Sequence, residues 1–205
     1  MVEIVPNVHQ ITVGQGEFPG VYAPNVFLVI GDGQAAFIDT ANGKSDEIRA
    51  QLALWETQGR PDIAAIILTH RHQDHLAGFG EITGSVDAPV GIGTEDVSAL
   101  PRPPEVELKD GDVVKFGNRE LQVLATPGHT EGARCFLLGH HLFSGDTLFP
   151  GGPGRTGSPE ALRQIIDSIT RKLLVLPDET AVYPGHGDDT TIGEARQEYQ
   201  DFASR

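Results

Sequence analysis

The sequence predicts a single α/β domain in which strands and one-sided helices pack in layers. Short apolar runs bounded by Gly, Asp or Asn recur through the first two thirds of the chain, as β-strands do. Segments with apolar residues at helical spacing lie between and after these runs, and each has one face to bury against a sheet. The length of 205 residues, of which 39% are hydrophobic, is enough for one substantial core.

The expected strands are short, and tight turns join some of them. Gly31-Asp32-Gly33 and Gly117-Asn118 stand between consecutive apolar runs, where hairpin turns with positive φ are expected. Much of the sheet structure is therefore predicted to pair locally. The apolar runs cover residues 26–30, 35–38, 63–68, 113–116, 121–125, 135–138 and 142–143.

Three one-sided helices are expected. Ser45 precedes apolar residues at helical spacing between positions 48 and 55. Ser158-Pro159-Glu160 combines an N-cap, a first-turn proline and a first-turn acid, and helical spacing of apolar residues follows it. Thr191 and Glu194 form a capping-box pattern that begins the last helix.

Charge and cysteine content exclude several kinds of partner and site. Twenty-nine acidic and 15 basic residues give a net charge of −14, which repels phosphate backbones and anionic headgroups, so neither nucleic acid nor a membrane surface is expected as a partner. Cys135 is the only cysteine, so no intrachain disulfide and no multi-cysteine zinc site can form. The N-terminal residues do not resemble a signal peptide, and no apolar run is long enough to span a membrane; a cytoplasmic location is expected.

Candidate metal ligands are concentrated directly after the apolar run at residues 63–68. His70, His72, Asp74 and His75 occur within six residues. In extended backbone, side chains two residues apart point the same way, so His70 and His72 can converge on one point while the other two enter the next turn. Four such groups would otherwise compete for hydrogen-bond partners, which favours metal binding over a structural role.

Three more ligand-type side chains, His129, Asp146 and His186, stand where other predicted strands stop. A single histidine of this kind is more often an ordinary hydrogen-bonded residue. These three positions are candidate metal ligands because the clustered motif at residues 70–75 is present as well. Imidazole and carboxylate without thiolate suit Zn, Fe, Mn or Ni. Seven ligands exceed the needs of one tetrahedral ion, whereas two ions about 3.5–4 Å apart that share one carboxylate would use them all and favour hydrolysis.

These motifs resemble those of the metallo-β-lactamase superfamily, and most closely those of its glyoxalase II (hydroxyacylglutathione hydrolase) branch. The resemblance covers nearly the whole chain, from Asn25-Val26-Phe27-Leu28-Val29 through Phe37-Ile38-Asp39-Thr40 to Pro184-Gly185-His186-Gly187. It implies an αββα four-layer sandwich, formed as a single domain by residues 1–205, with the metals at one edge of the sheets.

The resemblance also implies a role for each ligand. It places His70, His72 and His129 in a first metal site, Asp74, His75 and His186 in a second, and Asp146 between them. In this family, hydroxide held between two divalent ions, here expected to be zinc with iron or manganese as alternatives, attacks the carbonyl of a small-molecule thioester. Asp74 is placed to ligate one ion and orient that hydroxide. Arg155, in a loop similar to one of glyoxalase II, is expected to stabilise the loop or meet a substrate carboxylate.

Other functions stay open. β-Lactamases of the best-known subgroup carry Arg where His75 stands and Cys where Asp146 stands, which disfavours antibiotic hydrolysis. Persulfide dioxygenases resemble the same pattern and bind one iron through residues matching His72, His129 and Asp146. Hydrolysis of lactones or other esters is a further alternative, and a purely structural metal site ranks last because such sites are usually closed and rich in cysteine. The sequence leaves homo-oligomer formation open.

Overall fold

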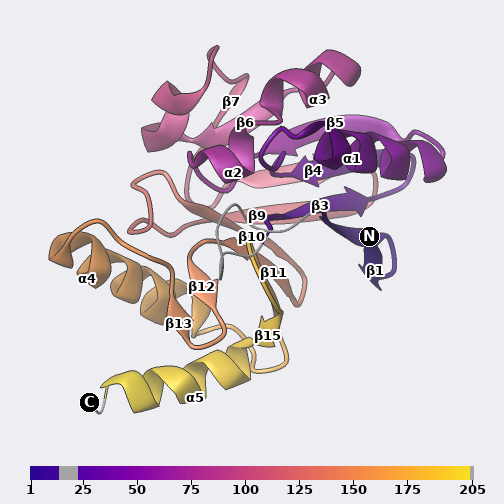
Figure 1. Ribbon diagram of the computed structural model, residues 1–205. Helices are drawn as coiled ribbons and strands as arrows, with labels where there is room; N and C mark the ends of the chain where they lie inside the picture. The colour runs from indigo at the N-terminus through magenta and orange to yellow at the C-terminus, as the bar shows by residue number, and fades with distance from the viewer. Residues whose placement is uncertain (14–22, 204–205) are drawn as a thin grey trace.

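Two β-sheets lie face to face between two layers of helices in the computed structural model, which describes residues 1–13 and 23–203 (Figure 1). Helices α1 (Ser45–Thr57) and α3 (Phe79–Ser85) cover one sheet. Helices α4 (Pro159–Ser168) and α5 (Ile192–Ala203) cover the other. The predicted αββα arrangement in one α/β domain is therefore confirmed.

The first sheet has seven strands, whose spatial order is the same as their order in the chain. Strands β1 to β4 are antiparallel neighbours, and β4 to β7 are parallel. The parallel strands are joined through α1, through the short α2 (Gln73–Leu76) with α3, and through the 3₁₀ helix η1 (Thr94–Ala99). The strands are β1 (Val2–Val5), β2 (Val8–Thr12), β3 (Asn25–Ile30), β4 (Gln34–Ile38), β5 (Asp62–Ile67), β6 (Val90–Gly93) and β7 (Val106–Leu108).

The second sheet has six strands in the order β15-β14-β11-β10-β9-β8. Helix α4, continued by the helical turn η2 (Ile169–Leu173), connects the parallel strands β11 and β14. A separate hairpin of β12 (Leu148–Phe149) and β13 (Gly152–Pro153) follows β11. The strands of the sheet are β8 (Val113–Phe116), β9 (Arg119–Ala125), β10 (Arg134–Leu138), β11 (His141–Gly145), β14 (Ala181–Pro184) and β15 (Thr190–Thr191).

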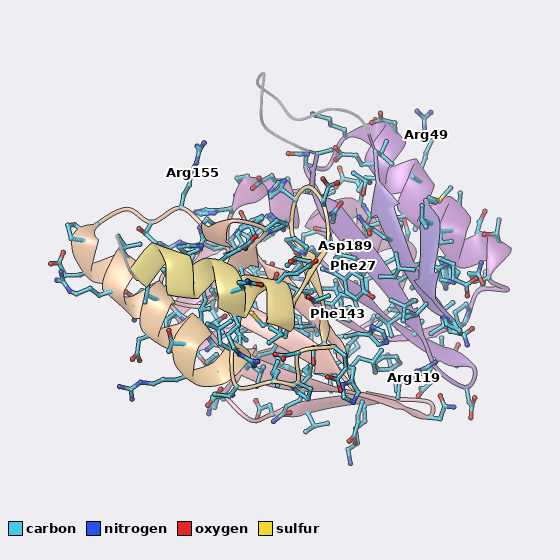
Figure 2. All side chains as sticks on the ribbon, turned by 90° about the horizontal axis from the view of Figure 1, so that it is seen from below. Phe27, Arg49, Arg119, Phe143, Arg155 and Asp189 are labelled. Atoms are coloured by element: carbon cyan, nitrogen blue, oxygen red, sulfur yellow. The ribbon has the colours of Figure 1, made fainter. Side chains whose placement is uncertain are left out.

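Side chains alternate between the two faces of each strand, so hydrophobic cores form on both faces of each sheet. In the paired strands β3 and β4, Phe27 and Ile38 face the second sheet, whereas Leu28 and Phe37 pack beneath α1 and α3. The rings of Phe27 and Phe143 lie 4.9 Å apart and join the two sheets in the middle layer (Figure 2). A third cluster fills the space between the second sheet and its helices.

The expected local signals are present at the starts of the three predicted helices. The Ser158 hydroxyl accepts a hydrogen bond from the Ala161 backbone, as an N-cap does. Thr191 and Glu194 each accept from the other's backbone N–H, which completes the predicted capping box. Helix α1 begins at Ser45, and the Glu47 carboxylate accepts from the backbone N–H of the residue before it, Lys44.

All seven predicted strand segments lie in strands, and Gly33 and Gly117 adopt φ values of 71° and 52° in the two predicted hairpin turns. In residues 1–13 and 23–203, none of the helices combines the length and the apolar character that a membrane-spanning helix requires.

Candidate metal centre

The loops that carry the candidate ligands leave the two sheets at one edge. Strands β9 and β11 both pair antiparallel with β10, and β14 pairs parallel with β11, so β9, β11 and β14 run in the same direction. Their carboxyl ends therefore meet at one edge. The segment after β5 reaches that edge from the other sheet, where the Thr69 carbonyl accepts a hydrogen bond of 2.8 Å from the Arg134 N–H of β10.

This convergence gathers all seven predicted ligands. Three groups have ligand atoms within 4.8 Å of one another: His70, His72 and His129; Asp74, His75 and His186; and His70, His75 and Asp146. We call the first of these groups the first cluster and the second the second cluster. They share no residue, and they are the two sets that the sequence predicted. The third group connects them through Asp146.

Nitrogen atoms face one another inside both clusters. His129 Nε2 lies 2.8 Å from His72 Nδ1 in the first cluster. His75 Nε2 lies 3.1 Å from His186 Nε2 in the second, and His186 Nε2 lies 3.2 Å from Asp74 Oδ2. Lone pairs at such distances repel unless a proton or a cation lies between them, so the geometry suits metal ligands.

Asp146 lies between the two clusters. Its Oδ1 is 3.4 Å from His75 Nε2, and its Oδ2 is 3.4 Å from His129 Nε2 and 3.8 Å from His186 Nε2. One carboxylate therefore reaches histidines of both clusters, as a bridging ligand does.

Two buried polar atoms indicate that these residues fit a divalent ion. His70 Nε2 and Asp146 Oδ1 are buried and have no hydrogen-bond partner among the residues that the structure describes. Buried polar atoms normally have one, because the cost of leaving them unpaired is about 1–3 kcal/mol. Both atoms belong to the group that joins the clusters, where a cation would satisfy them.

The buried carboxylate of Asp39 determines how the histidines of this group present their nitrogens. Its Oδ2 accepts from His75 Nδ1 and from the Thr69 hydroxyl, each at 2.8 Å, and its Oδ1 accepts from the Thr69 N–H. Because the Thr69 hydroxyl donates to Asp39, its oxygen accepts from His70 Nδ1, 3.0 Å away. Both rings are therefore protonated at Nδ1 and direct Nε2 toward the centre, an arrangement typical of metal-ligating histidines.

A backbone carbonyl gives His129 the same orientation. His129 Nδ1 donates to the Arg155 carbonyl at 2.7 Å, which leaves Nε2 to face His72 and Asp146. The loop that supplies this carbonyl is held close to the centre at Gly154, where an added Cβ would lie 1.8 Å from the Asp146 carbonyl oxygen. Only glycine allows the loop to approach so closely.

The electrostatics differ between the clusters. Burial and the neighbouring imidazoles lower the pKa of His70 and of His72, so these rings are neutral and can donate lone pairs. Burial by itself lowers the pKa of His75, but the carboxylates of Asp146 and Asp39 raise it well above its ordinary value. Hydrogen bonding to His186 lowers the pKa of Asp74. The carboxylate is therefore ionised at neutral pH.

The centre opens into a cleft of about 880 Å³. Five of the candidate ligands and the Gly- and Pro-rich loop of residues 149–158 line this cleft; the ligands are His72, Asp74, His129, Asp146 and His186. Arg155 lies on the rim, and its exposed side chain extends away from the body of the protein (Figure 2). A small molecule can therefore reach the cluster from solvent.

The αββα fold and a paired His/Asp cluster at one sheet edge define a metal-dependent class of protein. The model of the metallo-beta-lactamase superfamily matches residues 19–186, so the chain belongs to this superfamily. The buried Cys135, whose pKa burial raises to about 11, takes no part in this cluster.

Three relatives refine this assignment. The hydroxyacylglutathione hydrolase of Shewanella sp. (strain ANA-3) is 36% identical over 136 residues, which are 62% of this chain and 49% of that protein; this chain thus spans about half the length of that relative. ETHE1 from Myxococcus xanthus is 31% identical, with a TM-score of 0.79 over 97% of this chain and 85% of that one. TTHA1623, solved in a di-iron-bound form, is 32% identical, with a TM-score of 0.73 over 93% and 98% of the two chains.

Asp39 and Thr69, which hold ligands in place, were not predicted from the sequence, whereas Arg155 was expected to stabilise its loop. Asp39 stands directly after a predicted strand, and its φ of 64° is one that Asp tolerates better than most residues, but no spacing rule connects it to His75. Thr69 and the Arg155 carbonyl act through contacts that only the folded chain creates.

Proposed function

We propose that this protein is a metal-dependent hydrolase that cleaves small-molecule acyl thioesters. The observation that carries the proposal is the pair of three-ligand clusters that meet at Asp146 beside an open cleft. Two separate sets of ligands favour two ions over one. The di-iron form of TTHA1623, which matches nearly all of both chains, supports a paired centre.

In this proposal the first cluster would hold one ion, the second cluster would hold the other, and Asp146 would be a ligand that both share. When bound, a pair of divalent ions polarises a carbonyl group and lowers the pKa of water enough to supply a nucleophile at neutral pH. Zinc is the expected metal from the ligand types, and iron and manganese suit the same ligands.

The chain's own residues position the reactants. Asp74 is ionised and lies at the border of the cleft, where its carboxylate can accept a hydrogen bond from water and orient it toward a bound carbonyl. Arg155 contributes its carbonyl to His129 and presents its guanidinium at the rim, where it can meet a substrate carboxylate. The hydroxyacylglutathione hydrolases among the relatives make an acyl thioester the first substrate class to test.

Persulfide oxygenation is the second candidate, and one feature of the centre favours it. His72, His129 and Asp146 lie side by side, with His129 Nε2 2.8 Å from His72 and 3.4 Å from Asp146. Two histidines and one carboxylate on one face are typical of mononuclear iron oxygenases. With this function, the residues of the second cluster would not be iron ligands.

Metal analysis followed by paired assays tests the proposal. We expect purified, metal-loaded protein to contain two divalent ions per chain and to hydrolyse S-lactoylglutathione or another acyl thioester. Metal-loaded protein that is inert on all thioesters tested but cleaves lactones or other esters would redirect the proposal to those substrates. If the protein contains one iron per chain and consumes oxygen in the presence of a persulfide, persulfide oxygenation is its function and the thioesterase proposal is wrong.

A further inference from the structure

A buried carboxylate outside the seven candidate ligands connects two of the loops that carry them. Asp96 belongs to η1, and its side chain is 0% exposed. Its Oδ1 accepts from Arg71 Nη1 and from the Gly132 N–H, each at 3.2 Å. Its Oδ2 accepts from the Arg71 N–H at 3.1 Å and from the Thr130 hydroxyl at 2.6 Å.

The donors come from both sides of the first cluster. Arg71 stands between His70 and His72, so a hydrogen bond to its backbone N–H fixes the segment that presents both rings. Thr130 directly follows His129, and Gly132 is two residues further along the same loop. Asp96 contacts none of the three histidines itself, yet it holds the main chain next to each of them.

Close packing leaves the second loop little freedom to move. A Cβ added at Gly132 would lie 2.5 Å from Asp96 Cγ, and one added at Gly93 would lie 2.1 Å from the Gly132 carbonyl oxygen. Real Cβ atoms do not approach so closely, so the loop after His129 rests directly against η1 and the end of β6. The guanidinium of Arg71 balances the charge of the carboxylate.

We propose that Asp96 is a positioning residue for the first cluster, and that it sets the spacing between the His70–His72 segment and His129. The inference rests on the proposed metal centre. Asp96 acts through the backbone of two loops that are 34 and 25 residues away from it in the chain. Its removal should therefore weaken the binding of one ion and leave the ion of the second cluster in place.

The replacement Asp96→Asn tests the role with little change in volume. In the wild type, one carboxylate oxygen of Asp96 accepts from the Arg71 N–H and the other accepts from the Gly132 N–H. In either orientation, the asparagine amide places its NH₂ group against one of these two N–H donors, and that hydrogen bond is lost. Zinc titration of metal-free protein against a chromophoric chelator measures the two affinities separately. We expect about a 10–100-fold loss for one ion, the range for residues that orient metal ligands, and no change for the other.

A matched pair isolates one contact in case Asp96→Asn does not fold. Thr130→Val removes the hydroxyl that donates to Asp96, whereas Thr130→Ser keeps it. We expect the same selective loss in Thr130→Val and wild-type affinities in Thr130→Ser. Ile82→Ala serves as the control for general destabilisation. It truncates a fully buried residue of α3 that belongs to the core under this helix.

The outcomes separate this inference from the proposed function. Two ions bound with wild-type affinities in both Asp96→Asn and Thr130→Val would overturn the positioning role. The positioning role would also be overturned if both ions bound more weakly to the same extent and Ile82→Ala gave the same result, because the loss of affinity would then reflect lower stability alone. Wild-type protein that binds no ion would instead refute the metal centre on which the inference rests.

Discussion

The two clusters of the centre contain similar ligands but are held by different means. In the second cluster, Asp39 contacts a ligand ring directly through His75 Nδ1. In the first cluster, Asp39 acts on His70 only through the Thr69 hydroxyl. The other two contacts there involve the main chain: the Arg155 carbonyl accepts from His129, and Asp96 accepts from the Arg71 N–H. The second cluster should therefore be sensitive to single side-chain changes, and the first to the conformation of its loops.

Burial varies within each cluster. His70 in the first and His75 in the second are buried, whereas His72 is exposed in the cleft and His186 is half-buried. A deeply buried ring needs a hydrogen-bond partner for its second nitrogen, because no water can supply one. An exposed ring depends on its loop for orientation. Each cluster therefore combines a buried ring, held by hydrogen bonds, with ligands that depend on loop packing.

The largest effect is expected from His186→Ala, which removes a ligand from the second cluster and leaves the first intact. We expect kcat/KM for a thioester to fall on the order of 100-fold or more, which corresponds to at least about 2.7 kcal/mol of transition-state stabilisation. Bound metal should fall from two ions to one per chain.

His140→Ala is the matched control for His186→Ala. His140 is an exposed histidine on the turn before β11, and its described contact is with Glu179, outside the centre. Its removal should change neither turnover nor metal content. A His186→Ala protein that keeps full thioesterase activity would show that the second cluster has no part in the reaction.

Asp39→Asn tests the side-chain support of the second cluster. An amide cannot accept from all three of its donors, so at least one buried donor on Thr69 or His75 loses its partner. We expect a loss of about 1–3 kcal/mol in the free energy of unfolding, measured in urea. Zinc titration should show the larger loss of affinity for the ion of the second cluster, where His75 loses a direct contact, and a smaller loss for the first, where Asp39 acts on His70 through Thr69. If Asp39→Asn and Asp96→Asn cause their larger loss at the same ion, the proposed division between the clusters is wrong.

Gly154→Ala tests the loop support of the first cluster. The added methyl group would overlap the Asp146 carbonyl, so the loop must move and carry the Arg155 carbonyl away from His129. We expect a destabilisation of about 1–3 kcal/mol, as for other overpacked sites, together with a lower kcat/KM. Gly157→Ala, in the same loop but facing open space, should leave both quantities unchanged. Equal effects of the two substitutions would argue against the contact.

The smallest effect concerns Cys135, which is buried in β10 and contacts Thr126 and Ser144 rather than a ligand. Burial raises its pKa from 9.0 to about 11. Because the folded-state pKa is higher, the thiol stabilises the fold fully below pH 9 and loses this contribution as the pH rises toward 11. The stability advantage of wild type over Cys135→Ala should shrink by about 1 kcal/mol between pH 8 and pH 10, with metal content unchanged. A pH-independent difference would contradict this assignment.

Seven strand segments, the helices α1, α4 and α5, and the seven ligands could be predicted because each carries a signal within a short stretch of sequence. The group from His70 to His75 is dense enough to stand out, and His129, Asp146 and His186 follow strands that are themselves recognisable. Asp39 and Asp96 have no such signal, since single acidic residues occur throughout an acidic chain. Their partners are 25 to 36 residues away and become neighbours only when β4, β5 and β6 pair within the first sheet and the second sheet packs against it. Strands β1, β2, β6 and β7 of the first sheet were not predicted; β6 is half glycine, and β7 has only three residues.

The central claim is that the two clusters hold two divalent ions that share Asp146. An anomalous difference map from crystals of zinc-loaded protein, recorded at the zinc absorption edge, tests it most directly. We predict two peaks, one among His70, His72 and His129 and the other among Asp74, His75 and His186, with Asp146 in contact with both. A single peak, or peaks away from these side chains, would contradict the account.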